Sequence, residues 1–211
     1  MTGSDRRRYD VAKRALDIAA ASLLLVATSP LQSAVALSVL LCLGRPIVFR
    51  QPRVGRNGRV FTLVKFRSMR EPDPSRLLMS DSDRLTGFGR LLRATSLDEL
   101  PTLANVLRGE MAMVGPRPLL VEYLPRYSPE QARRHEVRPG MTGLAQVNGR
   151  NRVDWDERLR LDVEYVDSRS LKLDFKIVLR TFAVVLLRRG VQAEGHATMH
   201  EFLGQGTGGH S

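Results

Sequence analysis

A 27-residue stretch near the start of the chain, from Ile18 to Gly44, carries no charged side chain. About 20 apolar residues in a helix are enough to cross a lipid bilayer. The stretch is also about twice as long as the apolar core of a cleaved secretory signal, and no linker follows it. We therefore interpret it as a membrane segment.

The pair Ser29-Pro30 lies near the middle of this segment. A proline inside a helix removes one backbone hydrogen bond and clashes with the preceding turn, so the helix bends or breaks there. Each half then has about 12–14 residues, or about 20 Å of helix, which is too short to cross the bilayer. This favours a re-entrant helical hairpin, in which side chains of Thr28, Ser29 or Gln32 bind backbone groups that the proline leaves unpaired.

Basic residues flank the segment on both sides. They are Arg6, Arg7, Arg8, Lys13 and Arg14 before it, and Arg45, Arg50, Arg53, Arg56 and Arg59 after it. Basic residues beside a membrane segment favour the cytoplasmic side. Both ends are therefore expected in the cytoplasm, as a hairpin requires. A single spanning helix remains the alternative, since proline is also tolerated in spanning helices.

The positive charge of the chain is concentrated around this segment. The formal net charge is +11, and residues 1–70 hold 13 basic and three acidic residues. Such a region attracts either the phosphates of nucleic acid or the anionic cytoplasmic leaflet of a membrane. The position of the charge and an aromatic content of only 6% argue for the membrane and against nucleic acid. The single cysteine, Cys42, excludes disulfide scaffolds and cysteine-rich zinc sites.

The rest of the sequence predicts an α+β fold that is mostly helical. Ile47–Met69 alternates apolar and polar residues around Gly55–Gly58, which is the pattern of a β-hairpin. Gly115–Pro118 is expected to be a stiff loop because it holds two prolines, and Pro139–Asn151 is expected to be a glycine-rich loop. Helices are expected in Leu77–Arg93 with interruptions at Gly87 and Gly89, in Ser96–Leu107 ended by Gly109, in part of Leu119–Val137, in Asp154–Val166 and in Leu171–Arg189.

The last of these helices, Leu171–Arg189, combines a broad apolar face with several basic residues. This is typical of an amphipathic helix that lies in the membrane interface, and packing of the same face into a core is the alternative. The sequence thus divides into a re-entrant membrane hairpin with a basic N-terminus (1–45), a cytoplasmic domain (46–190) and a flexible tail (191–211).

The segment Thr95–Pro101, with the sequence TSLDELP, places two adjacent carboxylates at the start of a predicted helix. Ser96 followed three residues later by Glu99 is the pattern of a capping box, and Asp98 would complement the helix dipole. The same position suits chemistry, because a carboxylate there is expected to stay ionised beside a phosphate-binding site. Asp98 could then attack phosphorus, and the two carboxylates could share a divalent cation such as Mg²⁺.

Six motifs occur in a fixed order, and together they resemble the bacterial sugar transferase family. They are Phe49–Gly55 (FRQPRVG), Lys65–Met69 (KFRSM), Ser96–Pro101, Asn105–Gly109 (NVLRG), Val114–Pro118 (VGPRP) and Pro139–Asn151. Members of this family are monotopic polyprenyl-phosphate phosphoglycosyl transferases, and the resemblance runs from about Asp10 to Gly190. With 17 residues before the apolar stretch, the chain resembles the minimal form of the family.

The resemblance implies transfer of a sugar 1-phosphate from a UDP-sugar to a membrane polyprenyl phosphate such as undecaprenyl phosphate. It implies that Asp98 is the nucleophile and carries a covalent phospho-sugar intermediate, and that Glu99 holds Mg²⁺ or activates the acceptor. The products would be a polyprenyl diphosphate sugar and UMP, at the start of exopolysaccharide, O-antigen or glycoconjugate assembly. The implied location is the cytoplasmic face of the bacterial inner membrane, with residues 46–190 as the catalytic domain.

Further roles follow from the same resemblance. The basic residues that match the family's substrate- and phosphate-binding positions are Lys65, Arg93, Arg117 and Arg150, and phosphoryl transfer needs such fixed positive charge. Asp174 resembles an acidic position that helps to organise the metal, so the implied metal ligands are Asp98, Glu99 and Asp174. Ser29-Pro30 matches the bend of the family's re-entrant hairpin.

Two other classes of protein stay open on the residues alone. A non-enzymatic polybasic membrane scaffold would bind lipid in a salt-sensitive way without any dependence on Asp98 or Mg²⁺. A nucleic-acid-binding protein is disfavoured by the position of its basic residues around a membrane segment. The sequence does not name the sugar, and it is compatible with a homodimer.

Overall fold

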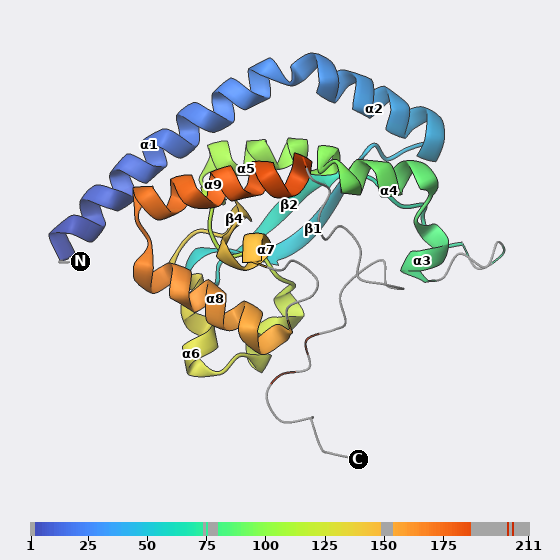
Figure 1. Cartoon of the computed structure of the whole chain (residues 1–211). Helices are drawn as coiled ribbons and strands as arrows, with labels where there is room; N and C mark the ends of the chain where they lie inside the picture. Colours follow the sequence, from blue (N-terminus) through green and yellow to red (C-terminus); the bar gives the residue numbers. More distant parts are fainter. Residues whose placement is uncertain are drawn as a thin grey trace.

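The structure is a computed structural model that describes residues 3–73, 75, 80–148, 154–186, 202 and 204. Within these residues helices predominate, and the strands form two sheets of two strands each. The mostly helical α+β fold expected from the sequence is confirmed. Figure 1 shows the first two helices as an arch over the other elements.

The arch consists of helix α1 (Gly3–Ala27) and helix α2 (Ser29–Leu43), which meet at Thr28. The two helices are bent by 63° at this point. Among the described residues no single helix is both long and apolar enough to cross a bilayer, whereas this bent pair meets the same criteria when its two helices are taken together. The predicted bend at Ser29-Pro30 is therefore present, and the membrane around it stays a prediction.

Side chains at the bend replace backbone hydrogen bonds. Pro30 has no N–H, so the carbonyl of Val26 lacks its usual helical partner. The Ser29 hydroxyl donates to that carbonyl at 2.8 Å. The Thr28 hydroxyl donates to a carbonyl one turn earlier at 2.6 Å, and the Gln32 amide donates to the Thr28 hydroxyl at 3.0 Å. The prediction holds for Ser29. The Thr28 hydroxyl binds the Leu24 carbonyl, which the Thr28 N–H also binds, and Gln32 binds the Thr28 hydroxyl rather than the backbone.

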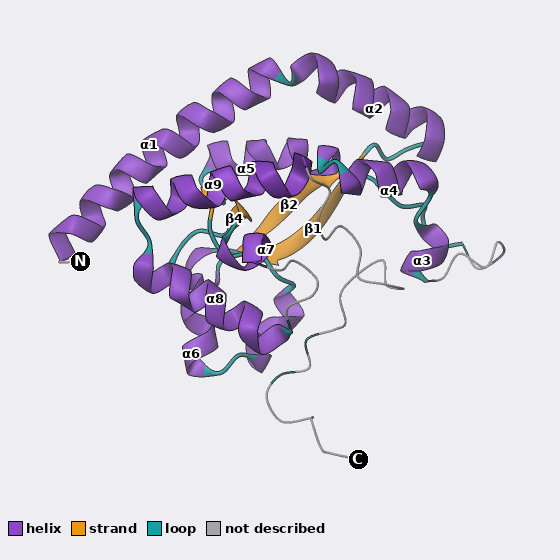
Figure 2. Ribbon diagram, in the orientation of Figure 1, coloured by secondary structure: helices purple, strands orange, loops and turns teal. Residues whose placement is uncertain are grey.

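Polar side chains of α1 fasten the arch to the domain beneath it. Arg14 donates to two carbonyls at the end of helix α5 (Leu103–Arg108), at 2.7 and 2.9 Å. Asp17 accepts a hydrogen bond of 3.1 Å from the backbone N–H of Met113, in strand β3 (Ala112–Val114). Figure 2 shows α5 between the arch and the larger pair of strands.

The predicted β-hairpin is confirmed. Strand β1 (Val48–Val54) pairs antiparallel with strand β2 (Val60–Phe66). Phe49 lies opposite Lys65 in this register. Because side chains alternate between the two faces of a strand, Arg53 lies on the same face of the hairpin as Lys65.

A second sheet was not predicted. Strand β3 pairs in parallel with strand β4 (Gly140–Thr142), and helix α7 (Leu144–Asn148) follows, so Pro139–Asn151 is not wholly the loop that its glycines suggested. A Cβ on Gly140 would lie 2.1 Å from the backbone nitrogen of Gly115. The glycines therefore allow close approach of two backbones, which a local reading of the sequence cannot distinguish from flexibility.

The other helical elements within the described residues include short 3₁₀ helices. They are η1 (Arg56–Gly58), α3 (Asp81–Arg84), α4 (Gly87–Ala94), η3 (Leu97–Thr102), η4 (Val121–Arg126), α6 (Pro129–Ala132), η5 (Arg133–Glu136), α8 (Trp155–Ser168) and α9 (Leu171–Leu186). The helix predicted from Ser96 thus begins as a 3₁₀ helix, which contains Pro101, and Gly109 caps α5 with φ 82° as predicted. Gly87 and Gly89 do not interrupt α4, because both lie inside it.

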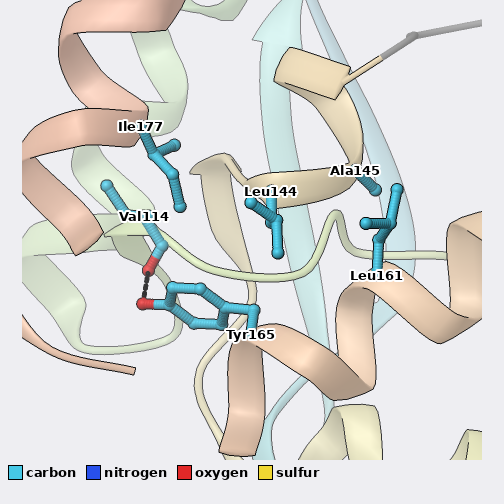
Figure 3. Close-up of a cluster of buried hydrophobic side chains, with 6 residues drawn as sticks. All are labelled: Val114, Leu144, Ala145, Leu161, Tyr165 and Ile177. Carbon is cyan, nitrogen blue, oxygen red and sulfur yellow. Dashed lines mark hydrogen bonds between the residues drawn. The ribbon is translucent and has the colours of Figure 1, made fainter. Parts of the chain in front are cut away.

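One buried hydrophobic cluster lies where β3, α7, α8 and α9 meet (Figure 3). Its residues are Val114, Leu144, Ala145, Leu161, Tyr165 and Ile177. Helix α9 contributes only one face to this core. The opposite face exposes Leu171, Phe175, Leu179 and Phe182. One apolar face of α9 therefore packs into the core, and the opposite face forms an exposed apolar stripe.

The predicted tail, residues 191–211, lies outside the described residues except for Phe202 and Gly204. The Phe202 side chain is buried in an aromatic cluster, stacked on Tyr127 with a centroid distance of 5.4 Å and tilted against Trp155 at 5.2 Å. Arg126 also donates a hydrogen bond to its carbonyl. At this residue the chain is packed against the domain, and the flexibility of the rest stays a prediction.

Candidate active site

The two adjacent carboxylates lie on η3, and hydrogen bonds hold this helix against strand β2. The Thr102 hydroxyl donates to the carbonyl of Val64 at 2.8 Å. Asn105 accepts from the N–H of Val64 at 3.2 Å and donates to the carbonyl of Thr62 at 2.7 Å. These bonds fix the carboxylates relative to Lys65, the next residue of β2.

The capping box predicted for this helix is not formed. Ser96 adopts a left-handed conformation with φ 57° and its side chain makes no capping hydrogen bond. A residue in that conformation does not present its hydroxyl to the first turn as an N-cap does. The Glu99 side chain instead binds Arg117, whose Nη2 donates to Oε1 at 2.8 Å. The predicted capping box is therefore wrong, whereas Asp98 and Glu99 do lie in the first turn of the helix as expected.

Arg117 lies between the two prolines of Gly115–Pro118, which is a loop as predicted. Its carbonyl accepts a 2.7 Å hydrogen bond from Nη2 of Arg134 on η5. Arg134 is itself paired with Asp162 on α8 at 2.7 Å, and both side chains are only 2% exposed. A buried ion pair thus supports the loop that presents the Arg117 guanidinium to Glu99.

Asp98 is buried, with 6% of its surface exposed. Burial and the neighbouring carboxylate of Glu99 raise the pKa of Asp98 to about 6, against the opposing effect of nearby cations. The side chain is therefore ionised at neutral pH, as expected, but it protonates in mild acid, which its position at a helix start did not suggest. Such a shift, caused by burial and a charged neighbour, is typical of groups that take part in catalysis.

Three of the four predicted basic residues lower the pKa of Asp98 through their positive charge. They are Lys65 on β2, Arg93 on α4 and Arg117. Lys65 Nζ lies 3.8 Å from Glu99 Oε1, and Arg93 Nε donates to the Ser68 hydroxyl at 2.9 Å. Burial lowers the pKa of Lys65, while Glu99 opposes that shift. The fourth predicted residue, Arg150, lies outside the described residues.

Asp174 is not brought together with the other two predicted metal ligands. It accepts hydrogen bonds from Tyr9 at 2.8 Å, Tyr165 at 2.7 Å and Lys13 at 3.1 Å, where α9 meets α1 and α8. In the part of the chain that the structure describes, no group of three or more His, Cys, Asp or Glu side chains could hold a metal ion. The carboxylate of Asp174 thus fastens α1 to the domain, and Asp98 and Glu99 remain as the candidate metal ligands.

Sequence reasoning assigned no site role to Arg53, which it counted among the basic flanks of the membrane segment and quoted within the motif Phe49–Gly55. Arg53 lines a small cavity of about 20 Å³ together with Lys65, Glu99 and Arg117. The predicted hairpin could have indicated this residue, because its register places Arg53 on the same face as Lys65. The pair of Arg134 and Asp162 gave no local signal, since 28 residues separate its members.

A buried carboxylate beside a second carboxylate and several fixed cations is the arrangement of a phosphoryl-transfer enzyme, in which positive charge is placed in advance around the reacting phosphate. Comparison with known proteins agrees with this class. The model of the family described as bacterial sugar transferase matches residues 8–188. The chain belongs to this family and is an enzyme of the phosphoglycosyl transferase class.

Several relatives are similar over most of this chain. The sugar transferase EpsL of Bacillus subtilis is 49% identical over 197 residues, which cover 93% of this chain and 98% of that protein. The UDP-glucose:undecaprenyl-phosphate glucose-1-phosphate transferase of Caulobacter vibrioides is 46% identical, over 86% of this chain and 72% of the relative. The undecaprenyl-phosphate galactose phosphotransferase of Salmonella typhimurium is 40% identical over 84% of this chain. The match covers only 41% of that relative, which is the longer protein.

Proposed function

We propose that this protein transfers a sugar 1-phosphate from a UDP-sugar to undecaprenyl phosphate at the cytoplasmic face of the bacterial inner membrane. The reaction would begin the assembly of an exopolysaccharide or a related glycan. The observation that carries the proposal is the buried Asp98, ionised at neutral pH and surrounded by Lys65, Arg93 and Arg117. The substrates named for the relatives in Caulobacter and Salmonella agree with this reaction.

The first half-reaction is a displacement at the sugar-bearing phosphorus. A carboxylate oxygen of Asp98 forms a bond to that phosphorus, and the bond to the oxygen that bridges the two phosphates breaks. The electron pair leaves with UMP, so no proton transfer is needed. Lys65, Arg93 and Arg117 stabilise the negative charge on the phosphoryl oxygens.

The second half-reaction reverses the roles of the groups. An oxygen of undecaprenyl phosphate attacks the phosphorus of the phospho-sugar on Asp98, and the carboxylate leaves. The product is undecaprenyl diphosphate sugar. One buried carboxylate thus serves two substrates in turn, which predicts ping-pong kinetics.

Asp98 and Glu99 also fit a Mg²⁺ ion, because Mg²⁺ usually takes one or two carboxylates together with substrate phosphate oxygens. Such an ion would neutralise charge on the diphosphate. The contacts of Glu99 with Arg117 and Lys65 hold its carboxylate in place beside Asp98.

We infer that the arch is a re-entrant membrane hairpin. Its exposed surface is apolar around the bend, where Leu23 and Val26 are each 70% exposed, and Leu41 farther along α2 is 76% exposed. Hydroxyl groups satisfy the backbone at the bend, as lipid requires. The exposed stripe of α9, together with Lys172 and Lys176 on the same helix, suits the membrane interface.

The test is an incubation of the full-length protein in nanodiscs with undecaprenyl phosphate, Mg²⁺ and each of a panel of UDP-sugars. We expect UMP release with at least one sugar. Without the acceptor, mass spectrometry should find a phospho-sugar on the peptide that contains Asp98. Asp98→Asn should abolish both signals, and Asp167→Asn, which changes an exposed carboxylate, should retain them.

Two results would contradict the proposal. UMP release by Asp98→Asn at the wild-type rate would show that Asp98 is not the nucleophile. An absence of UMP with every sugar, combined with salt-sensitive vesicle binding that does not depend on Asp98, would favour the polybasic membrane scaffold instead.

A further inference from the structure

We propose that Arg53 binds the phosphate of the nucleotide moiety, the leaving group of the first half-reaction. The inference rests on the proposed function and gives a role to Arg53, which lies in the motif Phe49–Gly55 but to which the resemblance assigned none. It is drawn from the position of Arg53 in the cavity, its hydrogen bonds and the charges around it.

Arg53 reaches the cavity from the same face of the hairpin as Lys65. Its guanidinium is held in place by two acceptors: Nη2 donates to Gln51 Oε1 at 2.6 Å, and Nη1 donates to the carbonyl of Pro118 at 3.3 Å. The third nitrogen, Nε, is buried and has no hydrogen-bond partner among the described residues. A buried donor without a partner is costly, and a phosphate oxygen is a strong acceptor for it.

The charges in the cavity also favour an anion. Arg53, Lys65 and Arg117 line it, with Glu99 as the carboxylate among them. Burial and the like charge of Arg117 lower the pKa of Arg53 to about 10, so it still carries its charge at neutral pH. Like charges held together in a partly buried site repel one another. A negatively charged phosphate oxygen of a bound diphosphate, which is small enough for a cavity of about 20 Å³, would relieve that repulsion.

The arrangement indicates which phosphate Arg53 contacts. The cations that act most strongly on Asp98 are Lys65, Arg93 and Arg117. Arg53 lines the cavity beside Lys65, Glu99 and Arg117, whereas Asp98 is not among the residues that line it. The transferred phosphorus must lie at Asp98, which leaves Arg53 for the phosphate on the nucleotide side. That phosphate receives the electron pair when the bridging bond breaks, so a cation there assists departure.

The experiment compares the binding of UMP and of uridine to the full-length protein in nanodiscs by calorimetry. Uridine lacks the phosphate, so the ratio of the two dissociation constants measures what the phosphate contributes. We expect wild type to bind UMP more tightly than uridine. In Arg53→Met the ratio of the two dissociation constants should fall roughly ten- to a hundredfold, as expected for the loss of a charge-assisted hydrogen bond. Arg50→Met, which removes an exposed arginine from the opposite face of the same strand, should leave the ratio unchanged.

Each outcome decides the matter. A weaker affinity for UMP with unchanged uridine affinity supports the contact. An unchanged UMP preference overturns it, and so does an equal loss for both ligands, which would assign Arg53 only to supporting the loop at Pro118. Should Arg53→Met fail to fold, Arg53→Lys keeps the charge and must still lower the ratio. Wild type that binds neither UMP nor any UDP-sugar would instead reject the proposed function.

Discussion

Replacing the nucleophile by its neutral isostere, Asp98→Asn, should stabilise the protein while abolishing turnover. Burial raises the pKa of Asp98 from 3.8 to about 6. Between these values the unfolded chain has lost the proton and the folded protein keeps it, so stability falls as the pH rises. Each pKa unit corresponds to about 1.4 kcal/mol. Above pH 6 the ionised carboxylate therefore costs the folded state about 3 kcal/mol.

The assay is thermal unfolding of wild type and Asp98→Asn in nanodiscs at pH 8 and at pH 5. For a chain of this size, about 3 kcal/mol corresponds to an increase in Tm of roughly 6–12 °C. The increase should be present at pH 8 and should shrink at pH 5, where wild type is itself largely protonated. A variant less stable than wild type at pH 8, or a gain equal at both pH values, would refute this reasoning.

The same pKa predicts how turnover depends on pH. Only the ionised carboxylate of Asp98 can attack phosphorus, so kcat/KM for the UDP-sugar should fall as the pH drops through about 6. A profile that stays flat down to pH 5, measured as UMP release, would contradict the assignment of the nucleophile.

Two further variants probe the bend and the support of the active-site loop. In lipid, Ser29→Ala should destabilise the protein by roughly 1–3 kcal/mol, because the Val26 carbonyl loses the hydroxyl that binds it in place of the N–H missing from Pro30, and thermal unfolding in nanodiscs measures the loss. Asp162→Asn should cost about 3–5 kcal/mol, because it leaves Arg134 buried without its counter-ion. It should also lower the rate of UMP release measured well below its Tm, since Arg134 holds the Arg117 carbonyl.

Each of these variants has a matched control. Ser38→Ala removes a similar hydroxyl bond of 2.9 Å inside α2, but its acceptor carbonyl keeps a normal helical partner, so no clear change in Tm is expected. Asp167→Asn removes the exposed partner of Arg133, next to the buried Arg134, and should leave Tm and activity unchanged. Equal effects in variant and control would show that neither the proline-freed carbonyl nor the buried pair has a special role.

Features set by neighbouring residues could be predicted from the sequence. The bend at Ser29-Pro30 follows from a missing N–H, which no distant residue can restore. The β1–β2 hairpin follows from alternation around Gly55–Gly58, and the end of α5 follows from Gly109. The resemblance to the family added Lys65 and Arg93, because motif order carries information that local pattern does not.

What could not be predicted depends on residues far apart in the chain. The parallel pairing of β3 with β4 joins three-residue strands too short to show alternation. The capping box is absent because Ser96 is left-handed, and the Glu99 side chain binds Arg117, 18 residues later, which no local pattern indicates. Asp174 carried a pattern of the family but lies in a separate network with two tyrosines. Burial of Asp98, which raises its pKa, arises only when η3 packs against β2, α4 and α2.

The proline loop explains how the site keeps its charges in place before substrate arrives. Prolines on both sides of Arg117 fix two backbone angles and leave few N–H donors to anchor the loop. Its carbonyls anchor it instead: the Gly140 N–H binds that of Pro116, Arg134 binds that of Arg117, and Arg53 binds that of Pro118. Catalysis by fixed cations is effective only if they need not reorganise in the transition state. The raised pKa of Asp98 indicates that these cations do not fully compensate its burial. The folded enzyme thus holds a carboxylate whose negative charge is unfavourable. Forming the bond to phosphorus would remove that charge.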